Sequence, residues 1–195
     1  SFVIYDTQEK ILYLCRDRLG EKPLYYGWIQ NTFVFSSELK AFKYYPNFQN
    51  SISRDSLSML VKYNYIPSPN SIYKDIYKLE PGKVLSIKNK CKKINFDNNY
   101  PVTTKNFVIR DYWNLKSAIL KNKNNKIDNK SEAIDLVEKN LGDVVKMQSY
   151  ADVPVGAFLS GGIDSSLITS LRCLDVLECK EVNLANSTLT FFKVF

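Results

Sequence analysis

Short runs in which hydrophobic and polar residues alternate open the chain and predict β-strands. Two such runs cover residues 1–6 and 10–16, and two more cover residues 24–28 and 32–35. The last two are separated by a turn around Gln30-Asn31, which predicts a β-hairpin. Strands that follow one another through short turns favour an antiparallel sheet.

Helical patterns interrupt these strands. Ser36, Ser37 and Glu38 are expected to cap a short helix over residues 39–44. Residues 53–63 form a second candidate helix with three apolar residues on one face, namely Leu57, Leu60 and Val61. Prolines after this helix are expected to end it. A strand is expected to end at Ile87, and the polar residues 91–106 are expected to be irregular.

A lysine- and asparagine-rich stretch at residues 116–130 lacks apolar periodicity and is expected to be a linker. It separates a first domain, residues 1–115, from a second, residues 131–195. The second begins with an amphipathic helix over residues 131–150, for which Ser131 is the expected N-cap. Its predicted inner face consists of Ile134, Val137, Leu141, Val144 and Val145.

The most informative stretch is residues 153–166. An apolar run over residues 155–159 predicts a buried strand, Ser160-Gly161-Gly162 predicts a tight turn, and a helix is expected to begin at Asp164. A strand, a glycine turn and a helix N-terminus together present free amides and a positive dipole end. This arrangement suits an anion such as a polyphosphate.

The turn lacks the Gly-Lys-Ser/Thr of a Walker loop and the glycine spacing of a dinucleotide site. It resembles the pyrophosphate-binding loop of the ATP pyrophosphatases, whose pattern is Ser-Gly-Gly-x-Asp-Ser. The resemblance implies ATP and Mg²⁺ as cofactors, with Asp164 as the candidate Mg²⁺ contact through pyrophosphate or as a residue that fixes the loop; a simple helix-start cap is the alternative. The implied ATP and pyrophosphate contacts are Leu159, Ser160, Gly161, Gly162, Asp164, Ser165 and Ser166.

Composition narrows the classes of function. The formal net charge is +7, but the lysines are scattered, so no nucleic-acid partner is expected. No histidine is present, which excludes Ser/His and Cys/His nucleophilic pairs. Because the four cysteines also show no C-x-x-C spacing, a zinc site is not expected. No apolar run has the length of a membrane span. We therefore expect a cytoplasmic protein without a membrane partner.

Several segments in a fixed order carry a wider resemblance. Arg16-Asp17-Arg18-Leu19-Gly20-Glu21-Lys22-Pro23-Leu24-Tyr25-Tyr26 resembles a segment of class II glutamine amidotransferases, and so do residues 35–41, residues 71–82 and Tyr112-Trp113. Followed by residues 152–166, they resemble glutamine-hydrolysing asparagine synthetases. The implied fold is part of an α+β glutaminase-type (Ntn αββα) sandwich, followed by the start of an α/β parallel-sheet ATP pyrophosphatase domain.

That resemblance implies asparagine biosynthesis. Aspartate is amidated through an acyl-adenylate with ammonia from glutamine, and ATP is cleaved to AMP and pyrophosphate. It also allows a homodimer. No catalytic residue is identifiable, because the family's N-terminal Cys nucleophile is absent, and Ser1 matches a late strand of the domain. We expect a truncated chain that is inactive alone; the alternatives are a related amidotransferase acting on another carboxylate and a non-catalytic nucleotide-binding remnant.

Overall fold

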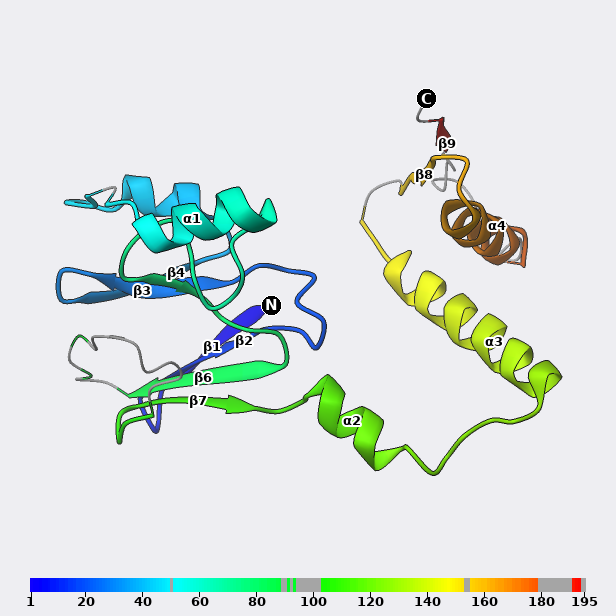
Figure 1. The fold of residues 1–195 in the computed structure, drawn as a ribbon, viewed down its shortest axis with the longest axis horizontal. Coiled ribbons are helices and arrows are strands. Elements are labelled where there is room, and N and C mark those ends of the chain that lie inside the picture. Colours follow the sequence, from blue (N-terminus) through cyan, green and yellow to red (C-terminus); the bar gives the residue numbers. More distant parts are fainter. Residues whose placement is uncertain are drawn as a thin grey trace. The chain divides into compact units, whose positions relative to one another are not determined.

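The computed structural model describes residues 1–49, 51–88, 91, 93, 103–152, 155–178 and 191–193, with the backbone alone for residues 174–178 and 191–193. The chain divides into two compact units, Ser1–Lys123 and Asn124–Phe195. Figure 1 shows the two units as one ribbon, coloured along the sequence. Each unit is described by itself.

The first unit is built on two antiparallel sheets. One sheet has the strand order β1-β2-β6-β7 and the other the order β4-β3-β5. The first sheet consists of β1 (Phe2–Asp6), β2 (Ile11–Cys15), β6 (Lys83–Lys88) and β7 (Phe107–Asp111), and the second of β3 (Tyr25–Ile29), β4 (Thr32–Ser36) and β5 (Ile76–Lys78). The four predicted N-terminal strands are thus confirmed, and Gln30 adopts a left-handed φ of 54° in the hairpin turn.

A hydrophobic core fills the space between the two sheets. Leu14 on β2, Leu85 on β6 and Phe107 on β7 are fully buried and belong to the same cluster as Tyr26 and Trp28 on β3. Successive strand residues point to opposite faces, so one face of each sheet supplies this core. The packed aromatic rings include Tyr26 and Phe107, whose centroids lie 6.2 Å apart.

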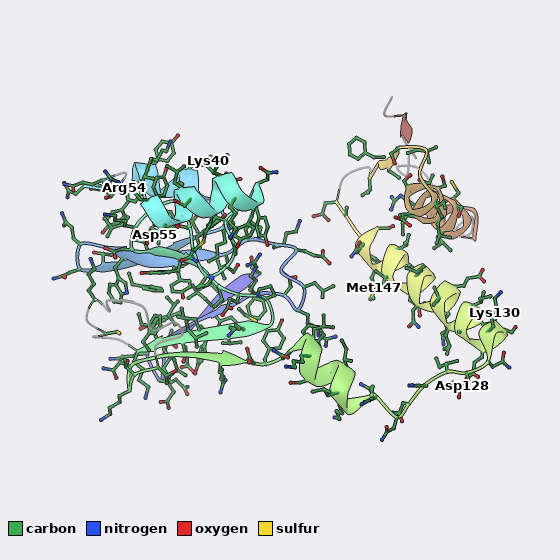
Figure 2. All side chains as sticks on the ribbon, viewed as in Figure 1. Lys40, Arg54, Asp55, Asp128, Lys130 and Met147 are labelled. Carbon is green, nitrogen blue, oxygen red and sulfur yellow. The ribbon has the colours of Figure 1, made fainter. Side chains whose placement is uncertain are left out.

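A helical layer covers the other face of the three-stranded sheet (Figure 1). It contains the 3₁₀ helix η1 (Leu39–Tyr44) and α1 (Arg54–Tyr63), and a second core cluster of Ile29, Phe42 and Ile76 lies beneath it. Lys40 lies on η1, and Arg54 and Asp55 begin α1 (Figure 2). The described part of this unit therefore has the layer order helix, sheet, sheet.

Local details of the helical layer differ from the predictions. Glu38 is the N-cap of η1 without a side-chain cap hydrogen bond, and the Ser36 hydroxyl accepts from the Glu38 amide instead. Ser53 caps α1 by accepting a hydrogen bond from the Ser56 amide. The predicted apolar face of α1 is largely exposed, at 45% for Leu57, 38% for Leu60 and 79% for Val61, while Ser56 is buried.

The predicted linker is not free of secondary structure. Helix α2 (Leu115–Lys121) lies in its first half, capped by the side chain of Asn114. Residues 122–129 carry no helix or strand, and the division between the two units falls after Lys123. Strand β7 was not predicted, because its apolar pattern is short and follows irregular residues. Residues 91–106 were predicted to be irregular, and of these only residues 91, 93 and 103–106 lie within the described part.

The second unit contains α3 (Lys130–Gln148), β8 (Ala157–Leu159), α4 (Ile163–Glu178) and β9 (Phe191–Lys193). Helix α3 packs against α4, and β8 pairs with β9 in parallel. In Figure 2, Asp128 lies just before α3, Lys130 at its start and Met147 near its end. Among the described helices, none combines the length and apolar character that crossing a membrane requires.

Two predictions for α3 and one for β8 are wrong. Asn129, rather than Ser131, caps α3, because its side chain accepts hydrogen bonds from the Ser131 and Glu132 amides. Of the predicted inner face only Val145 is buried and Leu141 half-buried; Ile134, Val137 and Val144 are exposed. Strand β8 is shorter than predicted, and its Phe158 is 70% exposed. An amphipathic pattern marks a face suited to burial, but neighbouring elements decide whether it is covered.

Candidate phosphate-binding loop

The Ser-Gly-Gly loop lies between the end of β8 and the start of α4. Leu159 is half-buried as the last residue of β8 and lies opposite Lys193 of β9 in the pairing register. Gly161 has a φ of +85°, and no atom lies within 4 Å of the position that a Cβ would occupy. Glycine is therefore favoured here by its backbone conformation rather than by lack of space. The predicted strand–turn–helix arrangement is confirmed.

Three serine side chains converge on this loop. The hydroxyl oxygens of Ser160 and Ser165 lie 3.0 Å apart. The Ser165 and Ser166 hydroxyls each donate to the Gly162 carbonyl, at 3.1 and 2.8 Å, and the Ser166 amide donates to the same carbonyl at 3.1 Å. These contacts tie the first turn of α4 to the loop that precedes it.

The loop is open to a ligand. Residues 160–164 are all exposed, and Ser165 is half-buried. They occupy the N-terminal end of a 16-residue helix, where amides lacking intrahelical acceptors and the helix dipole favour an anion. The loop amides, the Ser160 hydroxyl and the helix end thus offer hydrogen-bond donors of the kind that bind phosphate groups, while Ser165 and Ser166 donate to the Gly162 carbonyl and brace the loop.

Asp164 lies in the first turn of α4 and is exposed. Its carboxylate makes no hydrogen bond within the part of the chain that the structure describes, so the alternative of a helix-start side-chain cap gains no support. No group of three or more metal-ligating side chains occurs among the described residues. A metal ion at this loop would therefore depend on one carboxylate, the ligand's own oxygens and water.

A cavity of about 340 Å³ adjoins the loop. Asp164 and Ser165 line it together with Ser149, Thr169 and Arg172. The Thr169 hydroxyl is buried without a hydrogen-bond partner in the described residues. The sequence interpretation did not include Thr169 or Arg172, although both follow Ser165 at helical spacing and thus share a face of α4 with it.

The first unit gathers the other motif residues around Arg16. Its buried guanidinium donates to three carbonyls, those of Gly20 at 2.8 Å, Lys22 at 3.0 Å and Leu79 at 2.6 Å. The Tyr112 hydroxyl donates to the Arg16 carbonyl at 2.8 Å. Three segments that lie far apart in the sequence therefore meet at this residue.

Asp17 organises the same turn. Its carboxylate accepts hydrogen bonds from the amides of Glu21 at 2.7 Å and Lys22 at 3.1 Å. Desolvation opposes its ionisation, but hydrogen bonds from the Glu21, Lys22 and Gly20 amides outweigh this effect and lower the pKa of the carboxyl group. Arg16 and Asp17 thus have a structural explanation.

Neither Cys15 nor Cys91 is activated as a nucleophile. Desolvation raises the pKa of Cys15 and of Cys91, so both favour the protonated thiol near neutral pH. Cys15 and Cys173 form no disulfide within the described part of the chain. No catalytic residue emerges for the first unit from these groups.

Comparison with known proteins agrees with this arrangement. The family model described as "Glutamine amidotransferase domain" matches residues 1–100, which is more than half of the chain, and the model described as "Asparagine synthase" matches residues 136–173. The first match defines a class of proteins with a glutamine amidotransferase domain. The chain therefore belongs to the glutamine amidotransferase domain family, and its residues 136–173 are similar to asparagine synthases.

Three relatives illustrate the range of sequence identity and of names among the matching proteins. A putative asparagine synthetase [glutamine-hydrolyzing] 2 of Methanocaldococcus jannaschii is 37% identical over 88% of this chain and 30% of its own length. Asparagine synthetase [glutamine-hydrolyzing] 3 of Bacillus subtilis is 30% identical over 88% of this chain and 25% of its own length. The protein named Amidase chry2 of Gibberella zeae is 28% identical over 88% of this chain and 22% of its own length. The chain thus spans less than a third of each relative.

Proposed function

We propose that the loop at residues 160–166 binds the polyphosphate of ATP in a glutamine-dependent synthesis of asparagine. The observation that carries the proposal is the convergence of Ser160, Ser165 and Ser166 on an exposed glycine loop at a helix N-terminus. In this reaction ATP is cleaved between the α and β phosphates, and aspartate becomes an acyl-adenylate that ammonia attacks. AMP and pyrophosphate leave.

The loop contributes by stabilising negative charge. The exposed amides of Gly161, Gly162 and Ile163 donate to phosphate oxygens, and the Ser160 hydroxyl can turn from Ser165 toward the ligand. Negative charge grows on pyrophosphate as its bond to the α phosphate breaks. Fixed donors directed at that charge lower the barrier without reorganising during the reaction.

Mg²⁺ fits this loop because Asp164 is exposed beside the amides and its carboxylate has no partner among the described residues. This cation is commonly held by one or two carboxylates together with substrate phosphates and water. Bound in that way, it would neutralise charge shared between Asp164 and the phosphates. Asp164 would hold it from the first turn of α4.

For the first unit we propose the Ntn glutaminase sandwich, in which glutamine is hydrolysed to release ammonia. The helix, sheet, sheet order of the described elements supports part of that four-layer architecture. The proposed division into residues 1–115, 116–130 and 131–195 assigns the amidotransferase and synthetase roles to separate domains. Free cysteines are compatible with a reducing compartment such as the cytoplasm.

The acceptor of the amide is the least constrained part of the proposal. A related amidotransferase acting on another carboxylate is the second candidate, because one relative, Amidase chry2, bears a name other than asparagine synthetase. Both candidates require the same cleavage of ATP and therefore the same loop. They differ in whether aspartate or another carboxylate promotes the exchange of pyrophosphate into ATP.

Calorimetric titration of the chain with pyrophosphate, ATP and orthophosphate, each with Mg²⁺, tests the loop's role. We expect pyrophosphate and ATP to bind and orthophosphate to bind at least about tenfold more weakly, since a single phosphate reaches fewer of the converging donors. Equal affinities for the three ligands would contradict a polyphosphate site.

A further inference from the structure

Arg172 connects the two segments that flank the phosphate loop. It lies on α4, nine residues after Ile163 at the start of that helix, which is about two and a half turns. Its Nη2 donates to the carbonyl of Val155 at 3.2 Å, just before β8 begins. The loop lies between β8 and α4, so this hydrogen bond closes a ring that contains the loop.

The same guanidinium also contacts the end of α3. Its Nη1 donates to the hydroxyl of Ser149, the C-cap residue of α3. That hydroxyl in turn donates to the Val145 carbonyl at 2.7 Å. Carbonyls at a helix C-terminus carry partial negative charge, which a nearby cation stabilises. Arg172 thus joins α3, the segment that leads into β8, and α4.

The environment of Arg172 restricts its movement. The side chain is partly buried, and its Nε is fully buried without a hydrogen-bond partner among the described residues. The hydrogen bonds of the two terminal nitrogens therefore hold the guanidinium in place, although burying Nε without a partner is unfavourable. Arg172 lines the same cavity as Asp164 and Ser165 at the loop.

We propose that Arg172 is a positioning residue for the phosphate loop, setting the angle between β8 and α4 on which the loop's donors depend. The inference rests on the proposed polyphosphate site. Arg172 does not touch the ligand in this account. It acts by holding Val155 and Ser149 against α4, so that the Ser160 and Ser165 hydroxyls and the loop amides converge.

The test is the dissociation constant for pyrophosphate with Mg²⁺, measured by calorimetry at a temperature where circular dichroism shows each variant to be folded. We expect R172M, which keeps the volume but removes both hydrogen bonds, to weaken binding about tenfold. R172K keeps the positive charge but not the two-pronged hydrogen bonding, so we expect it to weaken pyrophosphate binding about threefold. S149A removes one of the two acceptors of Arg172 and should also weaken binding about threefold. S170A on the same helix should bind like the wild type, because the Ser170 hydroxyl donates to the Leu167 carbonyl within α4 and does not contact the loop among the described residues.

These outcomes separate positioning from simple stability. A purely structural role would lower the melting temperature of R172M but leave the pyrophosphate affinity of the folded protein unchanged, and that result overturns the inference. If R172M does not fold, unchanged affinity in both R172K and S149A overturns it equally. Absence of binding by the wild type would overturn the proposed site and this inference with it, whereas wild-type binding with unaffected variants overturns the inference alone.

Discussion

The Arg16 guanidinium donates a 2.6 Å hydrogen bond to the carbonyl of Leu79, across 63 residues of sequence. The Leu79 amide donates to the Leu24 carbonyl at 2.9 Å, so the strand end that carries Arg16 is joined to the second sheet. A charged donor shared among three carbonyls stabilises both the turn of residues 16–22 and the segment at Leu79. This explains, without a catalytic role, why arginine stands in this turn.

Replacing Arg16 with Met should therefore destabilise the first unit. Three carbonyl acceptors lose a charged donor in a largely buried place, and we expect a loss of about 3 kcal/mol in the free energy of unfolding. Urea unfolding followed by tryptophan fluorescence measures it. Arg18, exposed on the same turn, provides the control, since R18M should change stability by less than about 0.5 kcal/mol. Equal effects of the two substitutions would contradict this assignment.

Asp17 should make the stability of the first unit dependent on acid pH. Its folded pKa lies below the ordinary value of 3.8, so its contribution is present above that value and is lost as pH falls through the lower folded pKa. D17N should cost about 1 kcal/mol at pH 7 and should lose less stability than the wild type below pH 4, an estimate drawn from capping carboxylates.

Unfolding curves at a series of pH values compare D17N with D128N. Asp128 lies just before α3 and is exposed, so D128N should follow the wild-type pH profile. A D17N profile parallel to the wild type across the acid range would show that Asp17 does not carry this dependence.

Two glycines test whether the backbone conformation of the loop matters. A Cβ would meet no atom within 4 Å at either Gly142 or Gly161, but only Gly161 has a positive φ. G161A should strain the loop and weaken pyrophosphate binding about tenfold. G142A, in the interior of α3, should bind normally and gain about 0.5 to 1 kcal/mol in helix stability. Similar binding by the two variants would argue against a role for the loop geometry.

Limited proteolysis should cut first between α2 and α3. Residues 122–129 are exposed and carry no helix or strand, and they contain Lys123 and Lys126. Trypsin cleavage mapped by mass spectrometry should therefore begin there rather than within α2. A first cut within α3, at Lys139 or Lys146, would contradict the division into two units.

The sequence revealed elements whose signal is local. The hairpin of β3 and β4 follows from alternation and a two-residue turn, and the phosphate loop follows from paired glycines between apolar residues and a helix start. Both signals lie within about 15 residues, so no distant contact is needed to read them.

Distant contacts account for what was missed. Arg172 becomes notable only because α3 and the entry to β8 lie beside it. Asn129 displaced Ser131 as the cap of α3, since either side chain can cap and only geometry selects one. The exposed faces of Ile134 and Val137 follow from the absence of a covering element among the described residues, which periodicity alone does not report.

The most direct test of the central claim is an NMR titration of the ¹⁵N-labelled chain with pyrophosphate and Mg²⁺, following the backbone amide resonances. The account predicts that the largest chemical-shift changes occur at residues 160–166, led by the amides of Gly161 and Gly162, and that they saturate together. Changes confined to lysine-rich surface segments of the first unit, with the loop amides unmoved, would contradict it.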